Sequence, residues 1–428
     1  MRIDSIKVQN FKNFDNLEVS FDPGVNLFVG SNGSGKTSIL EAINVAAGGF
    51  FGSQEPKLQR VIDYDEIRIV NGQRAPYTTI KASSQLIQND WSRTIRRDTK
   101  ANDTKGIKAA SDYGKTFFEA FELPDDRTVT PLVAYYSTQR LFKDSSSSSK
   151  QKYDAANARR NGYLNCLKEN AIKGVLDEWL ANAVTRRATF QIKDIENIDL
   201  ILENVEAAIR FTLIEFLNLP SDFSLKIYQD PDFNNELFVN YDEEHNLPIS
   251  YYSDGFRNLL YLIFDLIWRA SQLNPWLNFE ELKAIIFGVV TIDEIDLHLH
   301  SKWQAKTISV IQQVFPGVQF FITTHSPTVV ANFEKGSLYV INANQIERHA
   351  DNFFGKQINN VLRNILGAPD RHVPTQQKID GLFRAIDDNL SNLYLPLLTE
   401  LTELLGVEDP DVIKARTLIE WKEDIANV

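Results

Sequence analysis

Residues 30–37 read Gly-Ser-Asn-Gly-Ser-Gly-Lys-Thr and constrain the fold more than any other stretch of the chain. They follow an apolar run typical of a buried strand, residues 25–29, and precede a helix pattern that begins at Ser38. Glycines let the backbone curl so that successive N–H groups point at a phosphate, and the helix that follows adds the positive end of its dipole. An ordinary glycine turn is the alternative, but the strand-loop-helix context favours a phosphate-binding loop.

This loop supplies candidate ligands for a bound nucleotide. Lys36 would reach the β- and γ-phosphate oxygens, and Thr37 would contact a magnesium ion. The residues that we expect to surround the nucleotide phosphates are Gly30, Asn32, Gly33, Ser34, Gly35, Lys36, Thr37 and Ser38.

Two further strand patterns end in polar residues. Residues 285–292 form a continuous apolar run that ends in Asp293 and Glu294, which is typical of a buried parallel strand. In phosphoryl transfer, one acid at such a strand end holds magnesium and its neighbour can polarise the attacking water. Asp293 is the candidate for the first role and Glu294 for the second. The other strand pattern, residues 318–324, ends at His325, a candidate sensor of the terminal phosphate.

The order of these elements resembles that of the ABC-type ATPase heads found in the SMC and RecF families, over roughly residues 1–345. Residues 2–14 and 17–21 look like the two N-terminal strands that precede the phosphate loop in such heads. The resemblance implies an α/β fold of the P-loop NTPase class, with a mixed central sheet, flanking helices and an N-terminal antiparallel β-subdomain. It also implies ATP and Mg2+ as cofactors and slow hydrolysis of ATP to ADP and phosphate.

The resemblance further implies a signature loop between the phosphate loop and the two acids. Residues 251–258 fit this loop, with Ser253 and Gly255 at the serine and second glycine of the family's LSGGQ pattern. In the family, the signature loop of one subunit closes over the nucleotide of another. We therefore expect a homodimer of heads or a higher oligomer, with Ser253 acting in trans. Gln139 is the candidate for the glutamine that contacts magnesium and water.

Two short stretches of sequence and the C-terminal region resemble those of a smaller group of ATPases within this class. Residues 293–300 and 323–327, followed by a helical end that contains residues 406–410, resemble the PtuA ATPases of Septu anti-phage defence, including their retron-associated relatives. This resemblance implies a sensor and regulator of a separate HNH-type nuclease. A RecF-like DNA-repair or recombination ATPase that clamps DNA stays open as an alternative. So does a nucleotide-gated scaffold with negligible turnover.

The pattern of elements predicts a chain in four parts. The insertion between the two ATPase lobes is too short and too broken for a long coiled coil, and it begins with a run of serines that cannot bury apolar surface. The predicted parts are an N-terminal ATPase lobe (1–142), a mainly helical insertion (143–245), a C-terminal ATPase lobe (246–345) and a helical assembly region (346–428).

Composition bounds the class of protein. The chain has 428 residues, of which 43% are apolar, so it can form real hydrophobic cores. Its apolar runs are shorter than the roughly eighteen residues of a membrane span, and its start lacks the layout of a secretory signal, so we expect a cytoplasmic protein without membrane contact. The single cysteine, Cys166, excludes an internal disulfide and is interpreted as a packed core residue.

The net charge of −12 is opposite to that of a general nucleic-acid surface, so any such contact must be local. A solvated face and a phosphate-contact patch are equally consistent with the one cluster of cations, between residues 93 and 108. The clustered cations are Arg93, Arg96, Arg97, Lys100, Lys105 and Lys108.

After the head only about eighty mostly helical residues remain, too few for the TOPRIM nuclease domain that is fused to related ATPases. We therefore expect no nuclease activity from this chain alone.

Overall fold

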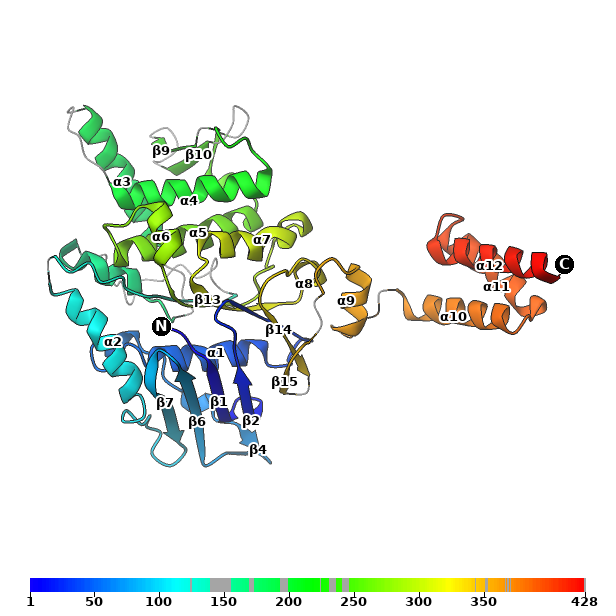
Figure 1. The fold of residues 1–428 in the computed structure, drawn as a ribbon, viewed down its shortest axis with the longest axis horizontal. Helices are drawn as coiled ribbons and strands as arrows, with labels where there is room; N and C mark the ends of the chain where they lie inside the picture. The colour runs from blue at the N-terminus through cyan, green and yellow to red at the C-terminus, as the bar shows by residue number, and fades with distance from the viewer. Residues whose placement is uncertain are drawn as a thin grey trace. The chain divides into compact units, whose positions relative to one another are not determined.

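The computed structural model divides the chain into two compact units, Met1–Val361 and Leu362–Val428. Figure 1 shows the order of the helices and strands along the chain. The boundaries expected near residues 142, 245 and 345 remain predictions. The structure describes residues 1–123, 125–138, 155–168, 173–192, 199–223, 225–230, 236–240, 246–342, 344–350, 353–365, 367, 369 and 371–426.

A six-stranded sheet forms the core of the first unit, in the order β15-β14-β3-β13-β12-β8. Neighbouring strands from β14 to β8 run parallel, and β15 runs antiparallel to β14. Every residue of β3, β8, β12 and β13 is buried, as expected of apolar strands covered on both faces. The strands are β3 (Val25–Val29), β8 (Leu132–Tyr136), β12 (Gly288–Ile292), β13 (Val318–Thr324), β14 (Ser337–Asn342) and β15 (Gln345–Arg348).

A second, antiparallel sheet has the order β2-β1-β6-β7. Helix α1 (Lys36–Gly48) contacts strands of both sheets and lies between them in Figure 1. Most of its residues are buried because apolar and small side chains occupy nearly every face of the helix. The strands are β1 (Ser5–Phe11), β2 (Phe14–Ser20), β6 (Tyr77–Ser84) and β7 (Ile87–Arg96), with a small hairpin of β4 (Ile69–Val70) and β5 (Gln73–Arg74) beside them.

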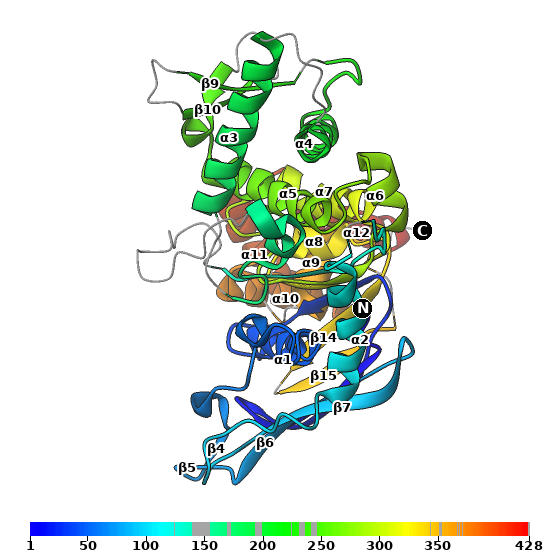
Figure 2. The ribbon, with the colours of Figure 1, turned by 90° about the vertical axis from the view of Figure 1, so that its left-hand side faces the viewer.

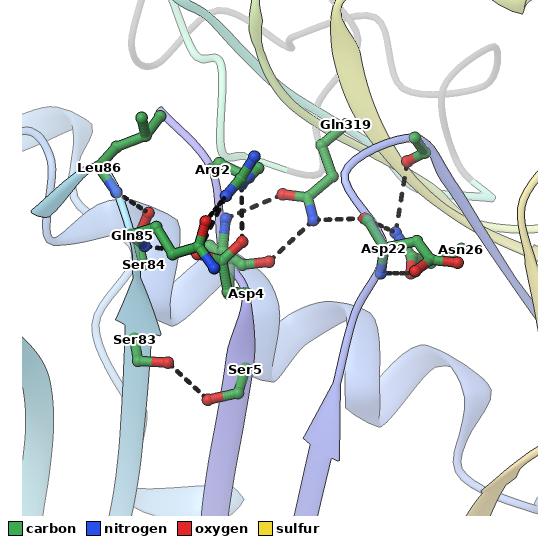
Figure 3. A network of polar contacts seen from close by, with 12 residues as sticks. Arg2, Asp4, Ser5, Asp22, Asn26, Ser83, Ser84, Gln85, Leu86 and Gln319 are labelled. Atoms are coloured by element: carbon green, nitrogen blue, oxygen red, sulfur yellow. Dashed lines mark hydrogen bonds and ion pairs between the residues drawn. The ribbon is translucent and has the colours of Figure 1, made fainter.

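The buried side chain of Gln319, on β13, ties the N-terminal segment to the central sheet (Figure 3). Its amide nitrogen donates to the carbonyl oxygens of Ile3 and Asp22, both at 2.8 Å. Its amide oxygen accepts from the Ile3 N–H at 2.9 Å. These bonds satisfy backbone groups where the chain enters β1 and leaves β2, and they fix the antiparallel sheet relative to the strands that carry the site.

Helices cover the other face of the central sheet (Figure 2). Helix α5 contacts β8 and α4, and α4 in turn contacts α6 and α7. The inserted segment contains helices, as expected, together with strands β9 and β10, which form a three-stranded sheet with β11, just after the segment, in the order β11-β10-β9. The remaining elements of this unit are α2 (Lys108–Ala120), α3 (Lys173–Ile192), α4 (Leu200–Leu217), β9 (Lys226–Asp230), β10 (Glu236–Asn240), β11 (Asn246–Pro248), α5 (Asp254–Leu273), α6 (Phe279–Ile285), α7 (Ser301–Val314) and α8 (Pro327–Ala331).

The second unit is a helical bundle with a core of its own. A short helix, α9 (Ile358–Asn364), comes before α10 (Val373–Asp387), α11 (Ser391–Leu405) and α12 (Pro410–Ala426). Over the described part of the chain, none of the helices combines the length and apolar character that crossing a membrane requires. The buried core residues are Ile379, Leu382, Ile386, Leu401, Val412, Ala415 and Ile419.

Candidate nucleotide site

The carboxyl ends of β3, β13 and β12 meet at one edge of the central sheet because these three strands are parallel neighbours. The loop after β3 needs glycine at two positions, since Gly33 has φ 77° and Gly35 has φ 110°. A Cβ at Gly35 would also lie 2.6 Å from Asn13 Nδ2 and 2.9 Å from Phe14 Cζ. The first turn of α1 follows Gly35, so the strand-loop-helix arrangement that the sequence predicts is present, and its role as a phosphate cradle stays a prediction.

The side chain of Lys36 is buried inside this loop, with 6% of the residue exposed. Its Nζ donates to the carbonyl oxygens of Gly30 at 2.9 Å and Ser31 at 2.8 Å. Burial lowers the pKa of Lys36, and the nearby Asp293 and Glu294 carboxylates oppose that shift. The ammonium group is therefore held among the loop carbonyls on the side of the two acids.

Thr37 and Asp293 connect the loop to the end of β12. The Thr37 hydroxyl donates to Asp293 Oδ2 at 2.8 Å, and the Asp293 N–H donates to the Tyr136 carbonyl at 2.8 Å. Magnesium binds oxygen ligands at about 2.1 Å, so two adjacent octahedral ligands lie about 3.0 Å apart. The spacing of the Thr37 and Asp293 oxygens therefore fits a shared magnesium ion.

Glu294 and His325 lie next to each other at the same edge. Glu294 has φ 47°, and its N–H donates to the Thr323 hydroxyl at 2.8 Å. His325 Nε2 is 3.9 Å from Glu294 Oε1, and the two side chains are partly exposed. Burial, followed by the Lys36 charge, lowers the pKa of His325 below its usual value of 6.5, so the imidazole is neutral at neutral pH. A neutral imidazole can donate one hydrogen bond to a phosphate oxygen.

Thr323 is a residue of this site that the sequence analysis missed. Its hydroxyl donates to Asp293 Oδ1 while accepting from the Glu294 N–H, so it orients both acids. The available signal was a threonine near the end of the strand pattern, two residues before His325. A sequence pattern cannot show that this hydroxyl faces the neighbouring strand.

The other loop residues differ in exposure. Asn32 is exposed, Ser38 is half-buried and Ser34 is buried. The Ser34 hydroxyl is buried without a hydrogen-bond partner among the described residues. A Cβ at Gly30 would lie 2.6 Å from the Ile341 carbonyl oxygen, so the loop packs closely against the end of β14.

The signature segment begins helix α5. Ser253 is exposed, and its hydroxyl caps the helix by accepting from the Phe256 N–H at 3.4 Å. Gly255 packs against the loop that follows Glu294, because a Cβ there would lie 2.2 Å from the His298 carbonyl oxygen. The role of Ser253 in trans stays a prediction. Gln139 lies outside the described residues.

The cation cluster between residues 93 and 108 is only partly available to a partner. The expectation that Arg93 contributes to it is wrong, because this residue is 2% exposed and donates to Gln59 Oε1 at 2.5 Å. The inward face of β7 packs on α1, and Arg93 lies on that face. The exposed members of the cluster are Arg96, Arg97, Lys100, Lys105 and Lys108.

Cys166 is a packed residue, as the sequence predicts. It is 1% exposed, and burial raises the pKa of its thiol to about 12. The thiol therefore stays protonated at neutral pH and is not available as a nucleophile.

The chain is similar in sequence to a known domain family and to several known proteins. Residues 5–213 match the AAA domain family. The chain is 27% identical to the retron Vc95 probable ATPase of Vibrio cholerae serotype O1 biovar El Tor, over 80% of this chain and 74% of that protein. It is 26% identical to the Septu protein PtuA of Bacillus thuringiensis, over 96% of this chain and 91% of that protein.

Among solved structures, an SMC head bound to the C-winged helix domain of ScpA is 14% identical, with a TM-score of 0.44 over 82% of this chain and 98% of that chain. The fold assignment rests instead on the strand order, the phosphate loop and the position of the two acids. The strand order, the phosphate loop and the two acids are arranged as in a P-loop NTPase fold, and the chain is similar along most of its length to Septu PtuA and the retron Vc95 ATPase.

Proposed function

We propose that this chain binds and hydrolyses ATP as the regulatory, sensing subunit of an anti-phage defence complex. The hydrogen bond between Thr37 and Asp293 is the observation that carries the proposal, because it joins the phosphate loop to the acidic strand end. Similarity to Septu PtuA and to a retron ATPase supports the defence role. The partner would be an HNH-type nuclease encoded separately, and the complex would work in the cytoplasm.

The phosphate loop would hold the triphosphate through its backbone N–H groups and the first turn of α1. Lys36 would exchange its bonds to the Gly30 and Ser31 carbonyls for phosphate oxygens. Thr37 and Asp293 would hold Mg2+, which neutralises phosphate charge when it is bound.

Glu294 would accept a proton from the attacking water, since its carboxylate is partly exposed beside the phosphate loop. Thr323 fixes the backbone of Glu294, and so limits where the carboxylate can lie. Neutral His325 would donate to the terminal phosphate and would therefore distinguish ATP from ADP.

Nucleotide binding would bring two heads together through the start of α5. The exposed Ser253 and the positive end of the α5 dipole suit a phosphate group of a second subunit. We expect wild-type protein to gain mass with ATP and Mg2+, and Ser253→Arg to remain at its ATP-free mass while still binding a fluorescent ATP analogue. Light scattering after size exclusion measures both states.

The control for this test is Ser309→Arg, which places the same side chain at an exposed position of α7. This control should associate like the wild type. ATP-dependent association that survives in Ser253→Arg would contradict the role in trans, and a mass that ignores ATP in the wild type would contradict nucleotide-driven dimerisation.

Nucleic acid could be contacted at the exposed end of β7. If this cation cluster contacts a handful of phosphates, affinity for duplex DNA should fall by roughly a thousandfold or more between low and moderate salt. Arg96→Glu with Arg97→Glu should then weaken binding and reduce the salt slope by about two. Fluorescence anisotropy over a salt series measures both effects.

Lys168→Glu with Lys335→Glu is the matched control, since it changes the net charge equally at two other exposed positions. A flat salt response, or equal binding by the two double variants, would remove the proposed contact. Tight binding of duplex ends by the isolated chain would instead favour the RecF-like alternative.

A further inference from the structure

Residues 296–299, which follow the two acids after Ile295, are held by contacts from β13, α5 and α7. The Thr324 hydroxyl, at the end of β13, donates to Asp296 Oδ1 at 2.5 Å. The Asn258 side chain, on α5, donates to the Leu297 carbonyl at 3.1 Å. Gly255 packs on the His298 carbonyl, where any Cβ would clash. The loop that carries the acids therefore also contacts the start of the signature helix.

The fourth contact comes from Gln304, in the first turns of α7. Its amide nitrogen donates to the Leu299 carbonyl at 2.9 Å, and its amide oxygen accepts from the Ser326 hydroxyl at 2.7 Å. Ser326 directly follows His325 and caps helix α8. One glutamine side chain thus joins the segment at His325 to the loop that ends at Leu299.

We propose that Gln304 is a positioning residue that couples movement of the His325–Ser326 segment to residues 296–299 and, through Asn258 and Gly255, to the start of α5. This inference rests on the proposed nucleotide site. A hydrogen bond made by His325 to the terminal phosphate would shift Ser326, and Gln304 would carry that shift to the Leu299 carbonyl. The signature helix would then respond to nucleotide before any second subunit is bound.

The side chain of Gln304 suits this role because its amide nitrogen and its amide oxygen each make a hydrogen bond. A side chain that only filled space would not need a donor and an acceptor directed at two different loops. Asn258 is 3% exposed, and its part-buried bond to Leu297 holds the start of α5 against the loop. Coupling of this kind requires that residues 296–299 and the start of α5 can each adopt two arrangements. Hydrogen-exchange measurements can detect a change between such arrangements.

The test is hydrogen exchange at a protein concentration where light scattering shows single chains, with and without ATP and Mg2+. In the wild type, ATP should slow exchange at residues 30–38, 296–299 and 253–258. Gln304→Met, which keeps the volume and removes both polar ends, should keep the protection at 30–38. The ATP-induced change at 296–299 and 253–258 should become about tenfold smaller, within the usual range of coupling between sites.

A second variant tests the contact between α5 and residues 296–299 separately from the contacts of Gln304. Asn258→Leu should keep the ATP response at 296–299 and lose it at 253–258. Gln313→Met, at an exposed position of the same helix, is the control and should respond like the wild type. In steady-state assays, Gln304→Met should lower kcat about tenfold with KM changed less than twofold.

Several outcomes would overturn the coupling role. Full retention of the response at 253–258 by Gln304→Met would do so. Loss of protection at 30–38 in this variant would also do so, because it would indicate a general structural defect. Absence of an ATP response at 253–258 in wild-type single chains would also overturn it. If the wild type binds ATP without hydrolysing it, the proposed enzymatic function fails, yet the exchange pattern still decides whether Gln304 couples the segments.

Discussion

Glu294→Gln should reduce the rate of ATP hydrolysis by about 10² to 10⁴, the usual cost of losing a general base. The amide has the shape of the carboxylate but cannot accept the proton of the attacking water. The backbone N–H of Glu294 keeps its bond to Thr323, so the loop should not rearrange. ATP affinity should be retained, because the contacts to phosphate come from the loop and from Lys36. Phosphate release under single-turnover conditions, together with equilibrium binding, measures the two effects.

The control for this prediction is Glu280→Gln, at a largely exposed side chain on α6 that pairs with Lys283 on the protein surface. It should hydrolyse ATP at the wild-type rate. Hydrolysis by Glu294→Gln within about twofold of the wild type would assign the base elsewhere. A parallel loss of binding and hydrolysis would instead mean that Glu294 is needed to form the site.

Lys36→Ala should weaken ATP binding by about 10²-fold or more. A charge-assisted hydrogen bond contributes about 1.5–3 kcal/mol, and the Lys36 ammonium can make more than one such bond to the phosphates. The substitution also removes the bonds to the Gly30 and Ser31 carbonyls, so the empty loop should become less ordered. Calorimetric titration with ATP and Mg2+ measures the loss of affinity.

Lys302→Ala is the matched control, since this lysine is exposed at the start of α7. The far-ultraviolet circular dichroism of Lys36→Ala should match that of the wild type, because Lys36 lies in the first turn of α1 and the packed face of that helix is unchanged. Wild-type affinity in Lys36→Ala would show that the nucleotide does not occupy the phosphate loop.

Much of the site could be predicted because its parts are local. The phosphate loop, the two acids and His325 each follow a short apolar strand, and each has a recognisable string of residues. Parallel neighbours bring such strand ends to one edge, so proximity in space follows from the strand order. The structure confirms that Thr37 lies next to Asp293 and that Glu294 lies next to His325.

The parts that the sequence did not reveal depend on contacts between distant segments. Thr323 and Gln304 are unremarkable in a sequence pattern, and only the fold directs their polar ends to the acids and to two loops. The prediction that Arg93 belongs to an exposed cation cluster was also wrong because of the fold. Its position in a run of cations suggested exposure, but the alternation of β7 turns it inward to Gln59.

Strand β11 (Asn246–Pro248) illustrates a further limit, because it contains only three residues. Such a strand is defined by its pairing with β10 and carries little periodicity of its own. Helices α4 and α5 have a stronger sequence signal because they are long and largely apolar.

A crystal structure of the protein with a slowly hydrolysed ATP analogue and Mg2+ would test the central claim most directly. We predict the triphosphate within residues 30–37, with Thr37 and Asp293 both at the metal and with Lys36 moved from the Gly30 and Ser31 carbonyls to phosphate oxygens. A triphosphate bound elsewhere, or a metal that Asp293 does not contact directly or through water, would contradict the account.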